Sequence, residues 1–171
     1  GSANIQIEIK DFDAKELEWW NQYGITKDTL KKFKVFSCKT VFLNGRVYTH
    51  VTKPVYGYYR GKTDVELWRI YFPYNKEPRF LSNWKSYMLQ GSKQLPKEGD
   101  LLVITKSMKD VMCLYNLGIT AIAPNSENLF LTEKQYAKLK KRFKRIVLFY
   151  DNDLPGIHNM NKFHKEYNIP C

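Results

Sequence analysis

The chain has little cysteine and no long apolar run, and both absences narrow its class. Its 171 residues include only Cys38, Cys113 and Cys171, an odd and scattered set that offers no disulfide framework and no paired zinc spacing. No apolar stretch approaches the roughly 18 residues that a membrane-spanning helix needs. We therefore expect a protein of a reducing compartment that has no membrane segment.

Acidic residues are also in short supply. The chain has 17 Asp and Glu against 28 Lys and Arg, which gives a formal net charge of +11. Such a surplus indicates a polyanionic partner, nucleic acid first, although a basic surface can also serve solubility alone. The hydrophobic share of 43% is enough for a real core and excludes global disorder.

The chain before residue 96 is rich in aromatic residues and predicts short helices followed by strands. Asp13 and Glu16 have the spacing of a capping box, and Thr26 can cap a second short helix. The pair Asn44-Gly45 separates two strand-like runs and predicts a hairpin. The expected strands are 34–37, 40–43, 47–52, 55–59 and 67–72.

The pattern changes after residue 97, where short apolar runs alternate with helical patterns. The expected strands are 101–105, 119–123 and 146–150, and the expected helices are 107–117, 132–143 and 155–167. This β-α-β-α-β-α order predicts an α/β unit with a mainly parallel sheet and helices on both faces. The basic residues of 134–145 either solvate a helix face or belong to a track for a nucleic-acid backbone.

Two carboxylates follow the third of these strands. Parallel α/β sheets bind ligands beyond the carboxyl ends of their strands, which is where Asp151 and Asp153 fall. Residues two apart in an extended chain point the same way, so both carboxylates can reach one divalent cation such as Mg²⁺. The alternative is a solvated turn with a helix-capping Asp, because Asp-Asn-Asp followed by Pro and Gly is common in turns.

The end of the first strand adds Lys106 and Asp110. Lys106 is expected at the same sheet edge, where a lysine binds phosphate as a point charge. Asp110 falls in the first turn of the following helix. There it either complements the helix dipole or adds a third carboxylate near the metal.

Together these residues resemble the motifs of a known family. Segment 100–163 resembles the TOPRIM fold shared by bacterial and phage primases, topoisomerases and related nucleases. Asp151 and Asp153 match the family's Asp-x-Asp motif, and Asp110 matches the Asp of its first motif. Upstream, segments 68–73, 79–83 and 89–91 look like the primase-specific polymerase subdomain.

Lys106 and Ser107 depart from the family, which has Glu and Gly at these positions. An ammonium group cannot bind a cation as a carboxylate does. Three interpretations stay open. Lys106 holds a phosphate in place of one metal, or Glu127 in the loop after the second strand supplies the missing carboxylate, or the site is inactive and only binds nucleic acid. Glu127 is otherwise an ordinary exposed loop acid.

The resemblance implies a DNA primase catalytic core, with a basic α+β polymerase subdomain at 4–96 and an α/β TOPRIM subdomain at 97–171 that is cut short at its C-terminus. It would synthesise short RNA primers on single-stranded DNA from ribonucleoside triphosphates. Asp151 and Asp153 would hold Mg²⁺ or Mn²⁺. The catalytic set adds Lys106, Asp110 and Glu127, and the residues expected to bind nucleic acid or nucleotide are Arg69, Arg79, Asn83, Lys85 and Lys109.

The resemblance also implies the setting in which the chain works. We expect a monomer in the cytoplasm of a bacterium or a phage-infected cell, excised from a longer protein, with a replicative helicase, fused or separate, as its partner. The rivals are a TOPRIM nuclease and an inactive TOPRIM module that only binds nucleic acid. Nucleotide incorporation, strand cleavage and binding alone separate the three.

Overall fold

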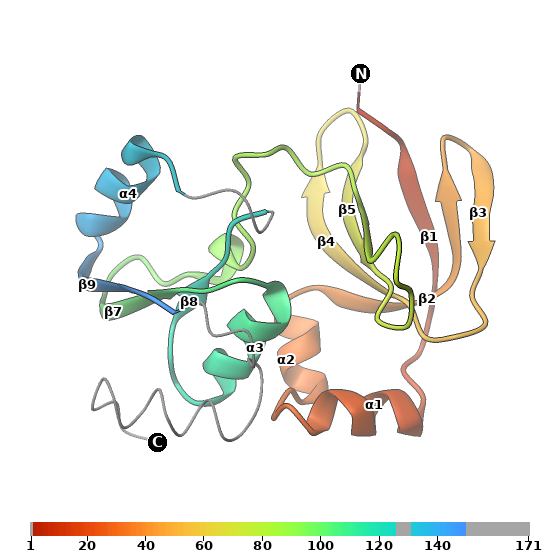
Figure 1. Ribbon diagram of the computed structural model, residues 1–171, viewed down its shortest axis with the longest axis horizontal. Coiled ribbons are helices and arrows are strands. Elements are labelled where there is room, and N and C mark those ends of the chain that lie inside the picture. Colours follow the sequence, from red (N-terminus) through yellow and green to blue (C-terminus); the bar gives the residue numbers. More distant parts are fainter. Residues whose placement is uncertain (1, 126–130, 150–171) are drawn as a thin grey trace. The chain divides into compact units, whose positions relative to one another are not determined.

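The computed structural model describes residues 2–125 and 131–149, and these form two compact units, each with its own sheet (Figure 1). The first unit comprises the residues up to Trp20 together with Thr26–Lys85. The second comprises Asn21–Ile25 and the described residues from Ser86 onward. Within this part of the chain, no helix is long and apolar enough to cross a membrane.

The first unit is built on an antiparallel sheet in the order β1-β2-β4-β5-β6, with β3 paired to β2. Trp68 and Ile70 form its core together with Ile5, Cys38 and Val41. The elements are β1 (Ile5–Lys10), α1 (Ala14–Asn21), α2 (Lys27–Lys32), β2 (Val35–Leu43), β3 (Arg46–His50), β4 (Tyr56–Lys62), β5 (Glu66–Tyr71) and β6 (Phe80–Ser82).

The helix caps predicted for the first unit are confirmed. The Glu16 amide donates to Asp13 Oδ1 at 2.8 Å, and the Asp13 amide donates back to Glu16 Oε1 at 3.1 Å. Glu16 is buried, and its carboxylate also pairs with Lys10 and accepts from Ser37 Oγ at 2.6 Å. The capping acid of α1 therefore also ties this helix to the sheet. Thr26 caps α2 as expected.

The strands of the first unit are predicted less completely than its helices. The Asn44-Gly45 hairpin is confirmed, with φ of 52° and 79° as a type I′ turn requires. The two strands expected at 34–37 and 40–43 are one continuous strand, β2. Strands β1 and β6 were not predicted at all.

The second unit carries a three-stranded parallel sheet in the order β8-β7-β9. Its elements are a short 3-10 helix η1 (Ser92–Gln94), β7 (Gly99–Ile104), α3 (Met108–Asn116), β8 (Ala121–Ile122), α4 (Glu133–Lys140) and β9 (Phe143–Leu148). The prediction of parallel pairing is confirmed here, but the larger sheet of the chain is antiparallel. A mainly parallel sheet thus describes only part of the fold.

Helices α3 and α4 lie on opposite sides of the parallel sheet (Figure 1). Leu139 of α4 packs with Leu102 and Ile104 on one face, and α3 contacts β8. The prediction that the second helix runs to Phe143 is wrong, because α4 ends at Lys140 and Phe143 opens β9. The Gly99 amide donates to the Arg142 carbonyl, so pairing with β7 overrides the helical pattern.

Gly91 offers a test of how tightly the second unit is packed. Its φ is +84°, and a Cβ there would lie 2.8 Å from Val111 Cγ1, whereas Gly118 has φ +78° and nothing within 4 Å. We expect Gly91→Ala to lower the free energy of unfolding by about 3 kcal/mol and Gly118→Ala by about 1 kcal/mol. Urea denaturation measures both. Equal losses would show that backbone strain alone, without overlap, sets the cost.

Candidate active site

The register of the parallel strands defines one edge of the second unit's sheet. Strands β7 and β9 pair from Gly99 with Phe143 to Ile104 with Leu148, and the Phe149 amide donates to the Ile104 carbonyl at 2.8 Å. The two strands therefore end level with each other. We call this end, where the chain leaves β7 towards α3, the carboxyl edge. Ligands of parallel α/β sheets bind at such an edge.

Helix α3 starts at the carboxyl edge and is held there from two sides. Ser107 caps the helix, with its Oγ accepting from the Asp110 amide at 3.2 Å. Gln90 is buried and accepts from the Met108 amide at 3.2 Å while donating to the Pro124 carbonyl at 2.7 Å. Gln90 thus joins the start of α3 to the segment that follows β8, and so fixes the geometry of the edge.

Asp110 is the unusual acid of this edge. It is 3% exposed, and among the described residues its Oδ1 has no hydrogen-bond partner. Burial raises the pKa of its carboxyl to about 6, against the opposing effects of the Ser107 hydrogen bond and the charges of Lys109 and Lys106. The Thr105 hydroxyl is likewise buried without a hydrogen-bond partner in this part of the chain. Buried polar atoms of this kind need an explanation, and a ligand at the edge supplies one.

The orphaned Asp110 oxygen fits a hard divalent cation such as Mg²⁺ or Mn²⁺, which takes oxygen ligands. A single carboxylate is not a metal site, and residues 2–125 and 131–149 contain no group of three or more His, Cys, Asp or Glu that could hold an ion. The predicted ligands Asp151 and Asp153 and the predicted acid Glu127 lie outside the described residues.

Two lysines lie next to Ser107 and Asp110 in the chain. Lys106 follows β7 and is half-buried, and Lys109 lies in the first turn of α3. The Lys109 ammonium sits 4.5 Å from the centre of the Tyr23 ring, a cation–π contact within the second unit. The structure therefore brings Lys106 and Asp110 to one edge, as the strand order predicts, and Lys109 lies in the same first turn.

The other predicted binding residues belong to the first unit. Arg69 is half-buried, with its guanidinium carbon 4.1 Å from the Phe80 ring centre, and burial lowers its pKa. Arg79 is exposed and donates to the Pro73 carbonyl at 3.4 Å. Lys85 is exposed and donates to Ser2 Oγ. Their roles in binding stay predictions.

Asn83 is buried, and its amide binds the backbone of its own unit. The oxygen accepts from the Trp68 amide at 2.8 Å, while the nitrogen donates to the carbonyls of Glu66 at 2.7 Å and Ala3 at 2.9 Å. These bonds hold the chain after β6 against β5 and β1. Binding of a nucleotide by Asn83 stays a prediction, but its amide already has a positioning role.

Gln90 lies in segment 89–91 of the family resemblance, but neither Gln90 nor Thr105 was predicted to be a site residue. Gln90 carries no local signal, since its partners Met108 and Pro124 are 18 and 34 residues away. The cap at Ser107 could be predicted from the sequence, because a Ser followed three residues later by an acid begins many helices.

The raised pKa of Asp110 gives a pH dependence of stability. The native state binds the proton of the Asp110 carboxyl more tightly than the unfolded chain does, because the pKa of this group is 3.8 in the unfolded chain. The stabilisation is therefore complete below about pH 4 and is lost as the pH rises through about 6. We expect the metal-free protein to lose about 2 kcal/mol of unfolding free energy over this window.

Asp110→Asn removes this loss, and urea denaturation in a chelator between pH 4 and pH 7 measures it. Asp11→Asn, a change at an exposed acid of the first unit, is the matched control and keeps the pH slope. A slope that persists unchanged in Asp110→Asn contradicts the assignment of the proton to Asp110.

Comparisons with known proteins show what this chain is similar to. Residues 103–170, which include Asp110, Asp151 and Asp153, match the family described as Toprim-like. The second unit therefore carries a Toprim-like domain. No curated protein sequence matches the chain.

Solved structures of primases share the fold of most of the chain. The Escherichia coli primase catalytic core is 15% identical with a TM-score of 0.57, and the match covers 85% of this chain and 58% of that one. The Aquifex aeolicus primase, with its zinc-binding and RNA polymerase domains, is 19% identical with a TM-score of 0.55, covering 88% and 46%. A DnaG primase catalytic domain bound to single-stranded DNA is 15% identical with a TM-score of 0.57, covering 81% and 55%. The chain spans about half the length of these structures, and at such identities the likeness shows the fold.

Proposed function

We propose that this chain is a DNA primase catalytic core that makes RNA primers on single-stranded DNA. The proposal rests on the combination of a Toprim-like domain with the fold of primase catalytic cores. The observation that carries the proposal is the extent of the likeness. It covers 85% of the chain and so reaches far beyond residues 103–170, the only part that a Toprim-like nuclease has to share. Fold alone does not fix activity, so the site must supply the chemistry.

The proposed metal site combines Asp151 and Asp153 with Asp110. Asp151 follows Phe149 by two residues in the sequence, and the pairing of Phe149 with Ile104 at the carboxyl edge supports the proposal. Asp110 Oδ1 is a buried oxygen that has no hydrogen-bond partner among the described residues. Bound to these carboxylates, Mg²⁺ or Mn²⁺ would neutralise charge on triphosphate oxygens and assist attack of a primer 3′-hydroxyl on the α-phosphorus, which releases pyrophosphate.

The lysines of the edge have a separate part in this proposal. Lys106 places an ammonium where the TOPRIM family has Glu, and a cation there holds a triphosphate oxygen directly. Lys109 adds a second positive charge on the first turn of α3, where the helix dipole also favours an anion. Ser107 and Gln90 hold that turn in place. Glu127 is proposed as a further acid of the site.

The proposed substrates and partners follow from the same comparison. We take single-stranded DNA as the template, because one of the similar structures is described as bound to it. Ribonucleoside triphosphates are the proposed building blocks. Arg69, Arg79 and Lys85 would carry template or nucleotide phosphates on the first unit. A monomer in a bacterial or phage-infected cytoplasm, working with a replicative helicase, completes the proposal.

Extension of an annealed RNA primer on a DNA template tests the proposed function. The primer supplies the 3′-hydroxyl, so initiation is not required. We expect ribonucleotide addition that depends on template and on Mg²⁺ or Mn²⁺, resolved on a denaturing gel. Cleavage of the DNA strand with no addition would identify a nuclease instead.

An inactive nucleic-acid-binding module is the second candidate, and Lys106 is the observation that favours it. A cation at this position opposes binding of a metal ion in the way that the family's Glu allows. Binding of single-stranded DNA that is unaffected by a chelator, together with no extension and no cleavage, would identify this function.

A further inference from the structure

A basic cavity lies at the opposite end of the parallel sheet from the carboxyl edge. Strands β7 and β9 begin together, with Gly99 paired to Phe143. A cavity of about 400 Å³ opens at these amino ends and is lined by Glu98–Asp100 and Lys140–Lys144. We call the four cations of this lining, Lys140, Lys141, Arg142 and Lys144, the amino-edge cluster. None of them is part of the site proposed above.

The sequence around the amino-edge cluster is basic wherever the fold leaves a side chain accessible. Six of the eight residues from Lys138 to Arg145 are Lys or Arg, and none is acidic. The two exceptions, Leu139 and Phe143, are the two that are buried, at 6% and 2% exposed. Core packing therefore accounts for the two apolar positions of this segment. It does not account for the positive charge of the other six.

The helix dipole accounts for part of this charge only. Lys138 and Lys140 lie in the last turn of α4, where cations are favourable. Lys141, Arg142 and Lys144 follow the end of the helix. The acids of the lining, Glu98 and Asp100, balance two of the four cations. The pair between Lys144 and Asp100, at 3.3 Å, has side chains 82% and 81% exposed, so it is weak and can exchange for a stronger anion.

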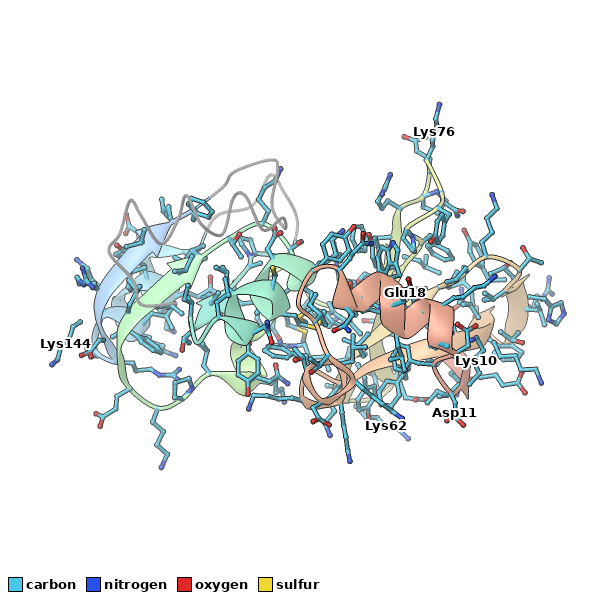
Figure 2. The ribbon with its side chains drawn as sticks, turned by 90° about the horizontal axis from the view of Figure 1, so that it is seen from below. Lys10, Asp11, Glu18, Lys62, Lys76 and Lys144 are labelled. Atoms are coloured by element: carbon cyan, nitrogen blue, oxygen red, sulfur yellow. The ribbon has the colours of Figure 1, made fainter. Side chains whose placement is uncertain are left out.

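Arg142 gives the amino-edge cluster a fixed member. Its Nε donates to the Lys97 carbonyl at 2.9 Å and its Nη2 to the Pro96 carbonyl at 2.7 Å. Two of the five N–H donors of the guanidinium are used in these bonds. Lys144, by contrast, points into solvent at the rim of the unit (Figure 2). A rigid guanidinium beside adaptable ammonium groups suits phosphate oxygens.

We propose that the amino-edge cluster is a second binding site for the backbone phosphates of a nucleic-acid strand. The six residues of β7 separate it from the carboxyl edge, and the five steps between the first and last of them span roughly 17 Å at about 3.3 Å per residue. One strand of a duplex places a phosphate about every 3.4 Å along its axis, so roughly five phosphates span this distance. A strand bound at the carboxyl edge reaches the cluster only when it extends several nucleotides further.

The inference deepens the proposed function and rests on it for the choice of nucleic acid as the polyanion. Its test measures binding, not synthesis. The triple variant Lys140→Gln, Lys141→Gln, Lys144→Gln removes three exposed charges. The matched control Lys27→Gln, Lys31→Gln, Lys39→Gln removes three exposed charges from the first unit. Fluorescence anisotropy with labelled single-stranded DNA of 4 and 20 nucleotides, titrated at several salt concentrations, compares both with wild type.

The cluster variant is expected to bind the 20-nucleotide strand more weakly, with a salt slope reduced by about 2, because each single-strand phosphate contact contributes about 0.7. The affinity advantage of the wild type over the variant therefore shrinks roughly 15-fold between 50 and 200 mM salt. The 4-nucleotide strand is expected to bind both proteins equally, and the control variant is expected to keep the wild-type slope.

Three results would overturn the inference. An unchanged salt slope in the cluster variant would show that the cluster makes no contacts with phosphates. An equal loss in the control variant shows that net charge alone sets the affinity. Binding of polyglutamate, but not DNA, through the cluster points to an acidic protein partner. If the wild type extends no primer while the cluster variant still loses its slope, the proposed function fails and this inference stands.

Discussion

Asp151→Asn and Asp153→Asn are each expected to lower the rate of primer extension by about a thousandfold, which corresponds to about 4 kcal/mol of transition-state stabilisation. Asn keeps the size of Asp and loses its charge, so the change removes a metal ligand with little effect on packing. Single-turnover extension of an annealed primer, followed across a titration of Mg²⁺, measures the loss. The two acids act on one cation, so the double variant is expected to be no slower than either single variant.

Asp11→Asn is the matched control for this pair, since it removes the same charge from an exposed site of the first unit and is expected to keep the wild-type rate. Circular dichroism shows whether each variant is folded. Two folded variants that extend primers at the wild-type rate would place the chemistry elsewhere in the chain.

Lys106→Gln is expected to lower kcat/KM for the incoming ribonucleotide by about a hundredfold, mainly through a higher KM. Lys106 is half-buried at the start of α3, and the loss of one charge-assisted bond to phosphate costs about 2–3 kcal/mol. Lys106→Arg restores the charge and is expected to recover part of the affinity. Steady-state extension at varied nucleotide concentration separates KM from kcat.

Lys93→Gln, at an exposed lysine of the same unit, controls for the loss of one positive charge. Lys106→Glu restores the acid that the TOPRIM family has at this position, and it is expected to lower activity further, because it repels the triphosphate. A Lys106→Glu variant that extends primers faster than wild type would contradict a phosphate-binding role for Lys106.

Signals confined to a few residues predict the structure well. The caps at Asp13 and Thr26 and the Asn44-Gly45 turn depend on neighbours within three residues, and each forms as expected. Strand β1 does not have this advantage. It becomes a strand by pairing with β2, where Ile5 is opposite Leu43, and that partner is 38 residues away. Such pairing overrides local preference.

The candidate site shows the same division. Strand order alone predicts that Lys106 and Asp110 lie at one edge, and they do. The burial of Asp110 was not predicted. It depends on packing at the start of α3, where the Met108 amide donates to the buried Gln90, and nothing in the sequence near Gln90 indicates this contact. The resemblance of its segment predicted that Asn83 binds nucleotide. In the structure its amide donates to the carbonyls of Ala3 and Glu66, which are 80 and 17 residues away.

The most direct test of the metal site is anomalous diffraction from crystals of this protein soaked in Mn²⁺. We expect one strong peak at the carboxyl edge, within about 2.2 Å of carboxylate oxygens of Asp151 and Asp153 and close to Asp110. The peak is expected to disappear in Asp153→Asn. Crystals that diffract well, contain Mn²⁺ in the soak and show no peak at this edge would contradict the account.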